Sequence, residues 1–574
     1  MTHLLALALL LLTACGSSDT GTLRIRTLAE GAEVPARLEV LDAGGAAYAA
    51  GDALTLHFEC EVAPLPEWLR SRISASDRLL NRETGTEQFY SAGRTHLEVP
   101  PGRYRIRGFK GIEHRVAHAE IQVRAGEETQ LDLPLERWID MPKEGWYSVD
   151  DHVHLTRRTP EDDVRIATWM RAEDLQVANL LQMGTVDQFG VTPQRAFGEE
   201  GAFRQGDTLL LAGQEHPRTH FLGHTITLGA ERPIDERDTY ILYQETFTAG
   251  RRAGGVSGYA HWGLGPGRDG LAIDGPRGLV HFVEVLQFAS PYYDVWYELL
   301  DLGSPVAPTA GTDFPCGPWS VPGAERFYAR LPEAPTRRGL VASVRAGRTF
   351  VTNGPLLDLR VGSTGIGDRL HLPEPKNVPI RGHVRFDPER DDVKQVELLR
   401  NGRPVPATLV RDSPGSIRVE LDRELGEAAW WALRVSGDKV GAALVSELPS
   451  GPVVDFLSPR VSNFDEHMRV QTAFHEARGR VAASAAHTGP VWVTVGRSQE
   501  AERLRAKPRA EDALVRLDAL EQRLSDEQIG DEAIWDWIPY SDGVSVEHLR
   551  RNRTALLRAI RHAKERYRQI LAYR

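Results

Sequence analysis

The chain has 574 residues, too many for one hydrophobic core, so several domains are expected. Asp and Glu number 80 against 69 Lys and Arg, which gives a formal net charge of -11. Nucleic-acid-binding proteins need a basic groove, so this balance argues against a nucleic-acid partner. Three cysteines exclude a disulfide scaffold and a Cys-rich zinc site. Any metal ligands must therefore be histidine nitrogens and carboxylate oxygens.

An apolar run at the N-terminus, Leu4–Leu12, leads through Thr and Ala to Cys15. The run is too short to cross a bilayer as a permanent helix. Leu-Thr-Ala-Cys resembles the lipobox of bacterial lipoproteins, whose cysteine is lipidated and becomes the mature N-terminus. The resemblance implies a signal and tether over residues 1–20 and a lipid anchor on Cys15. Gly16 after the cysteine favours the outer membrane of the cell envelope. The alternative is a plain cleaved signal peptide.

Residues 21–140 alternate between apolar and polar side chains in short runs broken by Gly and Pro. Examples are Leu23–Arg26, Ala36–Val40 and Tyr104–Arg107. A period of two between turn signals predicts a β-sandwich. The composition resembles the carboxypeptidase-regulatory-like sandwiches of secreted enzymes.

In residues 141–365 apolar strands alternate with helical stretches. Thr208–Ala212 and Val306–Ala310 are strand candidates, and Trp296–Leu302 and Arg337–Arg345 are expected to be helices. This alternation predicts a parallel α/β domain, and closure into a barrel is one way to cover its sheet.

Strand patterns return over residues 366–500, where we expect a second β-sandwich interrupted by an insertion at 449–480. Val393–Leu399 is one such strand, and the Asn401-Gly402 pair after it predicts a hairpin. Residues 501–574 carry leucines at helical spacing and predict a helical tail. Its arginines are interpreted as a solvated face rather than a lipid-binding surface.

Two histidines end the strand that begins near Val149. His152 and His154 are two residues apart, so both imidazoles project from the same face of the strand. At the carboxyl end of a barrel strand that face opens on the active-site mouth, which makes the imidazoles a ready pair of metal ligands. Asp150 is expected either to orient this pair by a hydrogen bond or to be a solvated turn residue.

A second apolar strand, Leu209–Ala212, leads to Glu215. A buried carboxylate is costly unless it is paired or bound to a cation, so Glu215 is a candidate bridge between two cations. His224 follows after a short loop and is the expected ligand, with His216 as the alternative.

Two later strands end in residues that can bind a metal ion. One leads to His261 and the other to Asp313. A single histidine at a strand end is more often structural. Because the other candidate ligands occur with it, His261 is interpreted as a metal ligand. Glu284 lies within a strand and is expected either to hold a histidine tautomer or to be a ligand itself.

Together these residues predict a binuclear metal centre. Imidazole and carboxylate suit two divalent cations about 3.5–4 Å apart. Zinc, manganese and iron all accept such ligands. The predicted ligands are His152, His154, Glu215, His224, His261 and Asp313.

Several ordered motifs surround these ligands. They are Gly-Trp-Tyr-Ser-x-Asp-x-His-Val-His at 145–154, Gly213-Gln214-Glu215 with Gly223-His224, Ala260-His261, Trp296–Gly303 leading to Gly311-Thr312-Asp313, Gly323–Tyr328, Arg345–Pro355 and Ala486–Pro490. In order and neighbours they resemble the PHP (polymerase and histidinol phosphatase) superfamily. The branch they resemble most is that of the CehA/McbA metallohydrolases, named for carbaryl hydrolases. The similarity covers roughly residues 145–355.

The resemblance implies a distorted (β/α)7 barrel between the two β-sandwiches. It also implies a hydrolase that uses a metal-bridging hydroxide on an ester, carbamate or amide bond of a small molecule. Asp313 and Glu215 would be the catalytic carboxylates, and Asp313 would take the proton of water and pass it to the leaving group. Arg326, Arg348 and Asn353 are candidates for contacting an anionic group of the substrate, with structural roles as the alternative.

The sequence departs from the trinuclear members of that superfamily at two places. Leu180–Met183 stands where they have Thr-Asp-His, and Phe314–Cys316 stands where they have a histidine after the final aspartate. Two cations are therefore expected rather than three. Two alternatives stay open for the function. One is a PHP-type phosphoesterase, and the other is a catalytically inactive envelope or glycan-binding lipoprotein.

Overall fold

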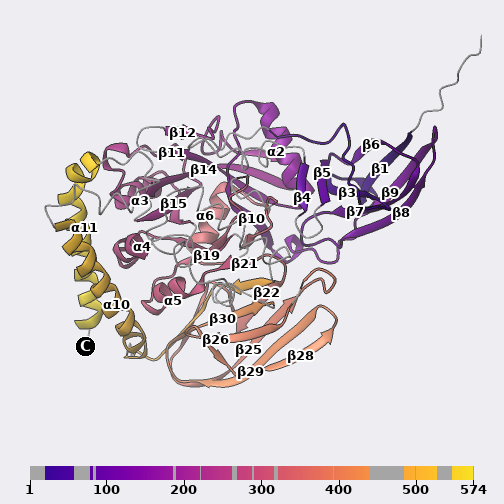
Figure 1. Cartoon of the computed structure of the whole chain (residues 1–574). Coiled ribbons are helices and arrows are strands. Elements are labelled where there is room, and N and C mark those ends of the chain that lie inside the picture. The colour runs from indigo at the N-terminus through magenta and orange to yellow at the C-terminus, as the bar shows by residue number, and fades with distance from the viewer. Residues whose placement is uncertain are drawn as a thin grey trace, which may run out of the picture.

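The computed structural model describes residues 20–56, 78–81, 86–184, 189–219, 222–260, 268–287, 290–315, 321–391, 393–437, 484–497, 500–525 and 546–572. Within them the chain is a mixed α/β structure dominated by strands, with a curled central sheet (Figure 1). The lipobox residue Cys15, the ligand candidate His261 and the insertion at 449–480 lie outside the described residues. Among the described helices, none combines the length and the apolar character that crossing a bilayer requires.

Two sheets form the N-terminal part (indigo in Figure 1). The predicted alternation is confirmed in β1, where Leu23 and Ile25 are buried and Arg24 between them is exposed. Leu38 and Ile106 of the second sheet share one hydrophobic core with these two side chains. The strands are β1 (Gly21–Ala29), β2 (Ala32–Glu33), β3 (Ala36–Asp42), β4 (Arg78–Asn81), β5 (Thr86–Ser91), β6 (Arg94–Val99), β7 (Gly102–Phe109), β8 (Ala117–Val123) and β9 (Glu128–Pro134).

Six strands of the curled central sheet run in the same direction. They are β10 (Trp146–Val153), β11 (Val177–Gly184), β14 (Thr208–Thr219), β16 (Val256–Tyr259), β17 (Phe282–Gln287) and β19 (Ala307–Ala310). β10, β11 and β14 pair in parallel, and so do β16, β17 and β19. β15 (Gly223–Leu228) joins the two groups and is antiparallel to both β14 and β16. The carboxyl ends of all six strands therefore lie at one edge of the sheet.

Helices connect these strands and pack their apolar faces against the sheet. Phe247 of α3, Trp296 of α5 and Leu340 of α6 belong to the same buried core as the strand residues Val177 and Leu209. The helices are α2 (Pro160–Ala172), α3 (Tyr243–Arg252), α4 (Arg268–Asp274), α5 (Tyr293–Asp301) and α6 (Arg337–Arg345), with short 3-10 turns η1 (Pro142–Glu144), η2 (Arg237–Thr239) and η3 (Gly275–Arg277). α6 has the predicted bounds, and α5 begins before the predicted start.

Shorter strands extend the central sheet. β20 (Arg326–Arg330) pairs antiparallel with β10 and then with β21 (Thr349–Thr352). β21 pairs in turn with β31, which connects the central sheet to the C-terminal strands. The remaining small strands are β12 (Phe189–Val191), β13 (Phe203–Gln205) and β18 (Ser290–Pro291).

The C-terminal β region (orange in Figure 1) has two layers around a second core. Successive side chains of β30 point to opposite faces of the strand and so enter different cores. Trp430 packs in the core of the central domain and Trp431 in the C-terminal core. The predicted hairpin is confirmed, with positive φ at Asn401 and Gly402 between β26 and β27. The strands are β22 (Leu356–Val361), β23 (Thr364–Gly365), β24 (Arg369–Leu372), β25 (Lys376–Arg385), β26 (Gln395–Arg400), β27 (Arg403–Val405), β28 (Thr408–Ser413), β29 (Ser416–Leu425), β30 (Ala429–Ser436), β31 (Ala485–Thr488) and β32 (Val491–Val495).

Two long C-terminal helices, α10 (Glu500–Ser525) and α11 (Val546–Ala572), lie side by side against α4 and α5 (Figure 1). Asp301 at the end of α5 joins three elements. Its carboxylate accepts hydrogen bonds from Trp430 Nε1 of β30 at 3.0 Å and from Arg509 Nε of α10 at 3.2 Å. The helical tail predicted from the leucine spacing is thus part of the folded body.

The N-terminal sheets meet the central domain at Trp169 of α2. Tyr90 of β5 stacks on its indole ring with 4.0 Å between ring centroids. Tyr90 Oη and Arg37 Nε each donate to Glu173 Oε1 at 2.7 Å. On its other side Trp169 contacts Phe314, which follows the end of β19, at 5.9 Å between centroids. The same buried cluster thus connects the N-terminal sheets to the edge where the central strands end.

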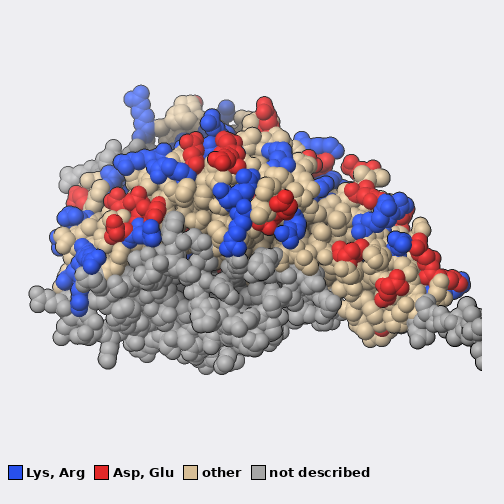
Figure 2. Space-filling view, turned by 90° about the horizontal axis from the view of Figure 1, so that it is seen from above, with Lys and Arg blue, Asp and Glu red and all other residues tan. Residues whose placement is uncertain are grey.

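The surface carries both signs of charge. Seen from above, the described Lys and Arg side chains are interspersed with Asp and Glu (Figure 2). Exposed ion pairs join oppositely charged residues of the described surface, such as Arg237 with Asp235 and Arg348 with Asp368. Pairs of this kind contribute little to stability because water screens them. The stability of the fold therefore comes chiefly from its buried cores.

We expect Trp169→Ala to lower the free energy of unfolding by about 3–5 kcal/mol, because the change removes a fully buried indole between two parts of the chain. Differential scanning calorimetry measures the effect as a lower midpoint. Leu409→Ala, at a side chain that is 46% exposed, is the control and should shift stability by less than about 0.5 kcal/mol. Equal midpoints for the two variants would contradict the proposed packing role.

Candidate metal centre

Four of the predicted residues meet at the edge where the parallel strands end. His152 lies at the end of β10 and His154 directly follows this strand, Glu215 comes from β14 and Asp313 from the turn after β19. The turn itself is tied to β10, because His154 N donates to Phe314 O at 2.6 Å. Parallel strands with their carboxyl ends at one edge thus collect residues that are far apart in the sequence.

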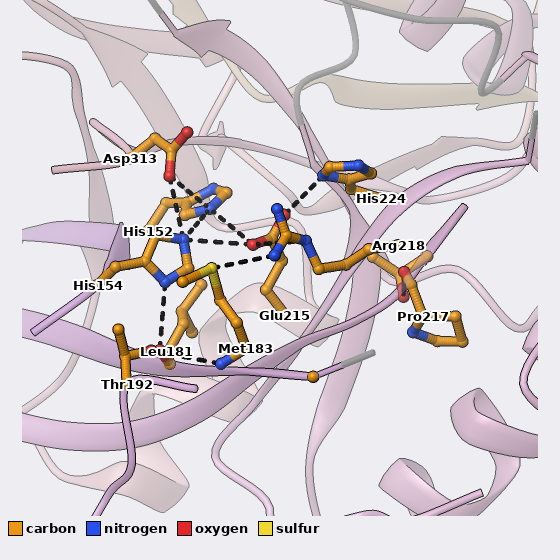
Figure 3. A network of polar contacts seen from close by, with 12 residues as sticks. His152, His154, Leu181, Met183, Thr192, Glu215, Pro217, Arg218, His224 and Asp313 are labelled. Carbon is orange, nitrogen blue, oxygen red and sulfur yellow. Dashed lines mark hydrogen bonds and ion pairs between the residues drawn. The ribbon is translucent and has the colours of Figure 1, made fainter. Parts of the chain in front are cut away.

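Nitrogen and oxygen atoms of these four residues converge (Figure 3). The two Nε2 atoms of His152 and His154 are 3.0 Å apart. Asp313 Oδ1 lies 3.3 Å from the first and 3.0 Å from the second. Glu215 Oε2 lies 3.2 Å from His154 Nε2. Among the described residues, His152, His154 and Asp313 satisfy the distances expected of a metal-binding group.

Hydrogen bonds on the outer nitrogens orient both imidazoles. His152 Nδ1 lies 3.1 Å from Glu284 Oε1, and His154 Nδ1 lies 3.2 Å from Leu181 O. When the imidazoles are neutral, these two acceptors favour the tautomer with the proton on Nδ1, in which the lone pair of each Nε2 points inward. Glu284 is therefore placed to hold the tautomer of His152, one of the two roles expected of it.

The inward-facing atoms form a set of acceptors that needs positive charge. Two lone pairs and two carboxylate oxygens within about 3–4 Å repel one another unless a proton or a cation lies between them. Burial opposes protonation of His152, but the carboxylates of Glu284 and Asp313 raise its pKa well above the ordinary value. His154 follows the same pattern, and hydrogen bonds to Asp313 and Glu215 raise its pKa. The donor set fits a divalent cation, which supplies this charge permanently.

Glu215 presents its second oxygen to a different residue. Oε1 lies 2.8 Å from His224 Nδ1, while Oε2 faces the two histidines of β10. Burial opposes ionisation of this carboxyl, but Arg218 and the three imidazoles hold its pKa well below the usual range. Each oxygen of this carboxylate therefore lies beside imidazole nitrogen, which the predicted bridging role requires.

Asp150 fixes the backbone around the site rather than an imidazole. Its Oδ1 accepts hydrogen bonds from His152 N at 3.0 Å and from Thr312 N at 3.1 Å. Its Oδ2 accepts from Thr312 Oγ1 at 2.6 Å and from Gly323 N at 2.8 Å. Burial raises the pKa of Asp150 to about 6. One carboxylate thus ties together the end of β10, the turn after β19 and the segment before β20.

Asp313 stands at a sharp turn. Its φ of 54° lies in the left-handed region, which Asp occupies more readily than most residues. Directly after it, Phe314 forms an isolated parallel bridge with Val153 of β10. The side chain of Asp313 is 13% exposed, whereas His152, His154 and Glu215 are essentially inaccessible. Asp313 therefore lies on the solvent side of the cluster.

Two other predicted residues are not part of this cluster as the structure describes it. His216 follows Glu215 on β14, and its surroundings include the backbone of Ile234; burial lowers its pKa to about 4. It is not part of the metal-binding group. His261 lies outside the described residues, so its predicted role as a ligand stays a prediction.

The three candidate substrate contacts have structural partners. Arg326 is buried and donates to Gly323 O and Glu173 O. Arg348 is half exposed and pairs with Asp368 at 2.9 Å. Asn353 Oδ1 accepts a hydrogen bond from Ala485 N at 2.8 Å, where β21 meets β31. These contacts favour the structural alternative for Arg326, Arg348 and Asn353.

Arg218 was not among the predicted site residues, although its Nε lies 3.3 Å from Glu215 Oε2. Strict alternation along β14 places residues 215 and 218 on opposite faces of the strand. The register with β15 shifts between these two residues, and such an irregularity re-aims side chains. Pro217 between these two residues was the available signal, because proline within a strand is confined to edges and bulges. The direction in which Arg218 turns cannot be predicted from a proline alone.

In comparisons with known proteins, no family model, no curated protein and no solved structure matches this chain. What can be concluded about function therefore depends on the side chains described above.

We expect Asp150→Asn to destabilise the protein by about 1–3 kcal/mol, because an amide nitrogen would face a backbone or hydroxyl donor in a buried site. Cation affinity should fall by about 10–100-fold, as for other losses of a supporting hydrogen bond. Thermal unfolding and a zinc titration measure the two effects. Asp368→Asn, at an exposed aspartate, is the matched control. Wild-type cation affinity in Asp150→Asn would show that Asp150 does not support the centre.

Cation affinity should rise as the pH increases from 6 to 8. In the cation-free protein the raised pKa values of His152 and His154 mean that protons occupy the positions a cation would take. Each displaced proton contributes on the order of tenfold in affinity per pH unit below its pKa. Titration calorimetry with Mn²⁺ in two buffers of different ionisation enthalpy counts the released protons. An affinity that does not change with pH would contradict this assignment.

Proposed function

We propose that the protein is a binuclear metal-dependent hydrolase of the CehA/McbA branch of the PHP superfamily. In this proposal the curled sheet and its helices are a distorted (β/α)7 barrel, and the β regions on either side are β-sandwiches. The observation that carries the proposal is the convergence of His152, His154, Glu215 and Asp313 at the carboxyl ends of parallel strands. In barrels of this general kind the active site lies at that end.

The residues divide naturally between two cation positions. His152, His154 and Asp313 would hold the first cation, together with Oε2 of Glu215. The second would lie at Oε1 of Glu215 beside His224, with His261 as a further ligand from the end of β16. Histidine nitrogen and carboxylate oxygen suit zinc, manganese or iron.

Bound divalent cations would supply a nucleophile by lowering the pKa of water and would polarise the oxygen of the scissile bond. The chain's own residues would position and transfer protons. Asp313 lies on the solvent side of the cluster, where its carboxylate can accept a proton from the attacking water and donate it to the leaving group. Glu284 and Leu181 O hold the two imidazoles of β10 in the ligand tautomer throughout.

An ester, carbamate or amide of a small molecule is the proposed substrate, as the resemblance to carbaryl hydrolases implies. A phosphoester is the second candidate. The specific observation in its favour is the guanidinium of Arg218 beside Glu215, since arginine binds phosphate and carboxylate groups well.

Purified protein stripped of metal and then loaded with Zn²⁺, Mn²⁺ or Fe²⁺ should hydrolyse nitrophenyl acetate in a metal-dependent way. The double variant His152→Ala/His154→Ala should lose more than about 100-fold in activity, because losing ligands costs more than losing a supporting hydrogen bond. Arg348→Met, away from the cluster, is the control and should keep wild-type rates.

A parallel assay with nitrophenyl phosphate separates the two substrate classes. Turnover of the phosphate alone would replace the ester proposal by the phosphoesterase. Turnover of neither substrate by metal-loaded protein would favour the inactive envelope-binding alternative.

A further inference from the structure

Arg218 is an arginine whose guanidinium reaches the cluster. Figure 3 shows its guanidinium over the carboxylate of Glu215, between Met183 and His224. Its Nε lies 3.3 Å from Glu215 Oε2, and its Nη1 lies 3.1 Å from the sulfur of Met183. The side chain is 14% exposed, so it lies, like Asp313, on the solvent side of the buried histidines.

The backbone of Arg218 is held firmly. Its N–H donates to Tyr240 Oη at 3.0 Å, and Tyr240 Oη donates to Gly184 O at 2.9 Å. Arg218 also pairs with His224 across the β14–β15 ladder, so the two residues leave neighbouring backbone positions. A side chain whose backbone is fixed in this way can hold a bound group in a defined orientation.

With cations bound, the site would carry an excess of positive charge, and this excess indicates what kind of group Arg218 would bind. Two divalent cations would outweigh the carboxylates of Glu215, Asp313 and Glu284, and the guanidinium would add a further positive charge. Positive groups this close repel one another unless an anion lies between them. A neutral ester gains little from such an arrangement. A carboxylate or phosphoryl group matches it, because the guanidinium is a planar fork of donors suited to two oxygens.

We propose that Arg218 determines specificity by binding an anionic oxygen group of the substrate, a carboxylate or a phosphoryl group, on the solvent side of Glu215. The inference rests on the proposed function, because it assumes that cations occupy the cluster. It deepens that function by naming the preferred substrates, which carry a negative charge beside the scissile bond or at it; a neutral ester such as nitrophenyl acetate would react without this contact.

The test compares anion binding in three cation-loaded proteins by titration calorimetry: wild type, Arg218→Met and Arg218→Lys. Inorganic phosphate and succinate are the two probes. Arg218→Met should weaken binding of at least one probe by about tenfold or more, in line with a lost charge-assisted hydrogen bond. Arg218→Lys should retain part of the affinity, because lysine keeps the positive charge but lacks the planar set of donors of a guanidinium. The probe that loses more identifies the group, phosphoryl or carboxylate.

Arg348→Met is the control, since Arg348 is an arginine paired with Asp368 on the surface, and it should bind both probes as the wild type does. Cation content is measured on every protein by mass spectrometry, and circular dichroism checks folding. Equal anion affinity in wild type and Arg218→Met, with both fully loaded, would overturn the role of Arg218 and leave the hydrolase proposal intact. A wild-type protein that takes up no cation would refute the proposed function and this inference with it.

Discussion

The mutual repulsion of acceptor atoms at the centre is the constraint on which the site depends. Two imidazole nitrogens and two carboxylate oxygens face one another within a buried space. Such an arrangement is unfavourable unless positive charge fills it, so the fold must hold these groups in place against their repulsion. The strand directions, the tautomer-holding contacts and the hydrogen bonds of Asp150 all contribute to holding them.

The surrounding architecture supplies that rigidity from several directions. Asp150 connects the end of β10 to the turn that carries Asp313. Trp169 packs between the N-terminal sheets and Phe314, the residue after Asp313. On another side, Asp301 connects the central domain to the C-terminal strands and helices. The position of Asp313, a candidate cation ligand, thus depends on packing contributed by parts of the chain that supply no candidate ligand themselves.

Much of this could be predicted from the sequence, because period-two and helical patterns depend on local burial. Both histidines of β10 lie on one face as their spacing predicts, and α6 has its predicted bounds. What could not be predicted arises from irregularities and tertiary contacts. The register shift after Glu215 turned Arg218 toward the cluster. Pro217 marks an irregularity there, but a proline alone does not predict which way the next side chain turns. Arg326 was a candidate for substrate binding, yet tertiary contacts bond its guanidinium to carbonyl oxygens of the chain.

The most direct measurement is anomalous diffraction at the zinc absorption edge from crystals grown with Zn²⁺. The account predicts two peaks about 3.5–4 Å apart. One should lie about 2.0–2.2 Å from the Nε2 atoms of His152 and His154 and from an oxygen of Asp313, and the other beside His224. Both should contact Glu215. Anomalous peaks confined to the protein surface, with Arg218 still paired to Glu215, would contradict the central claim that this cluster is a metal centre.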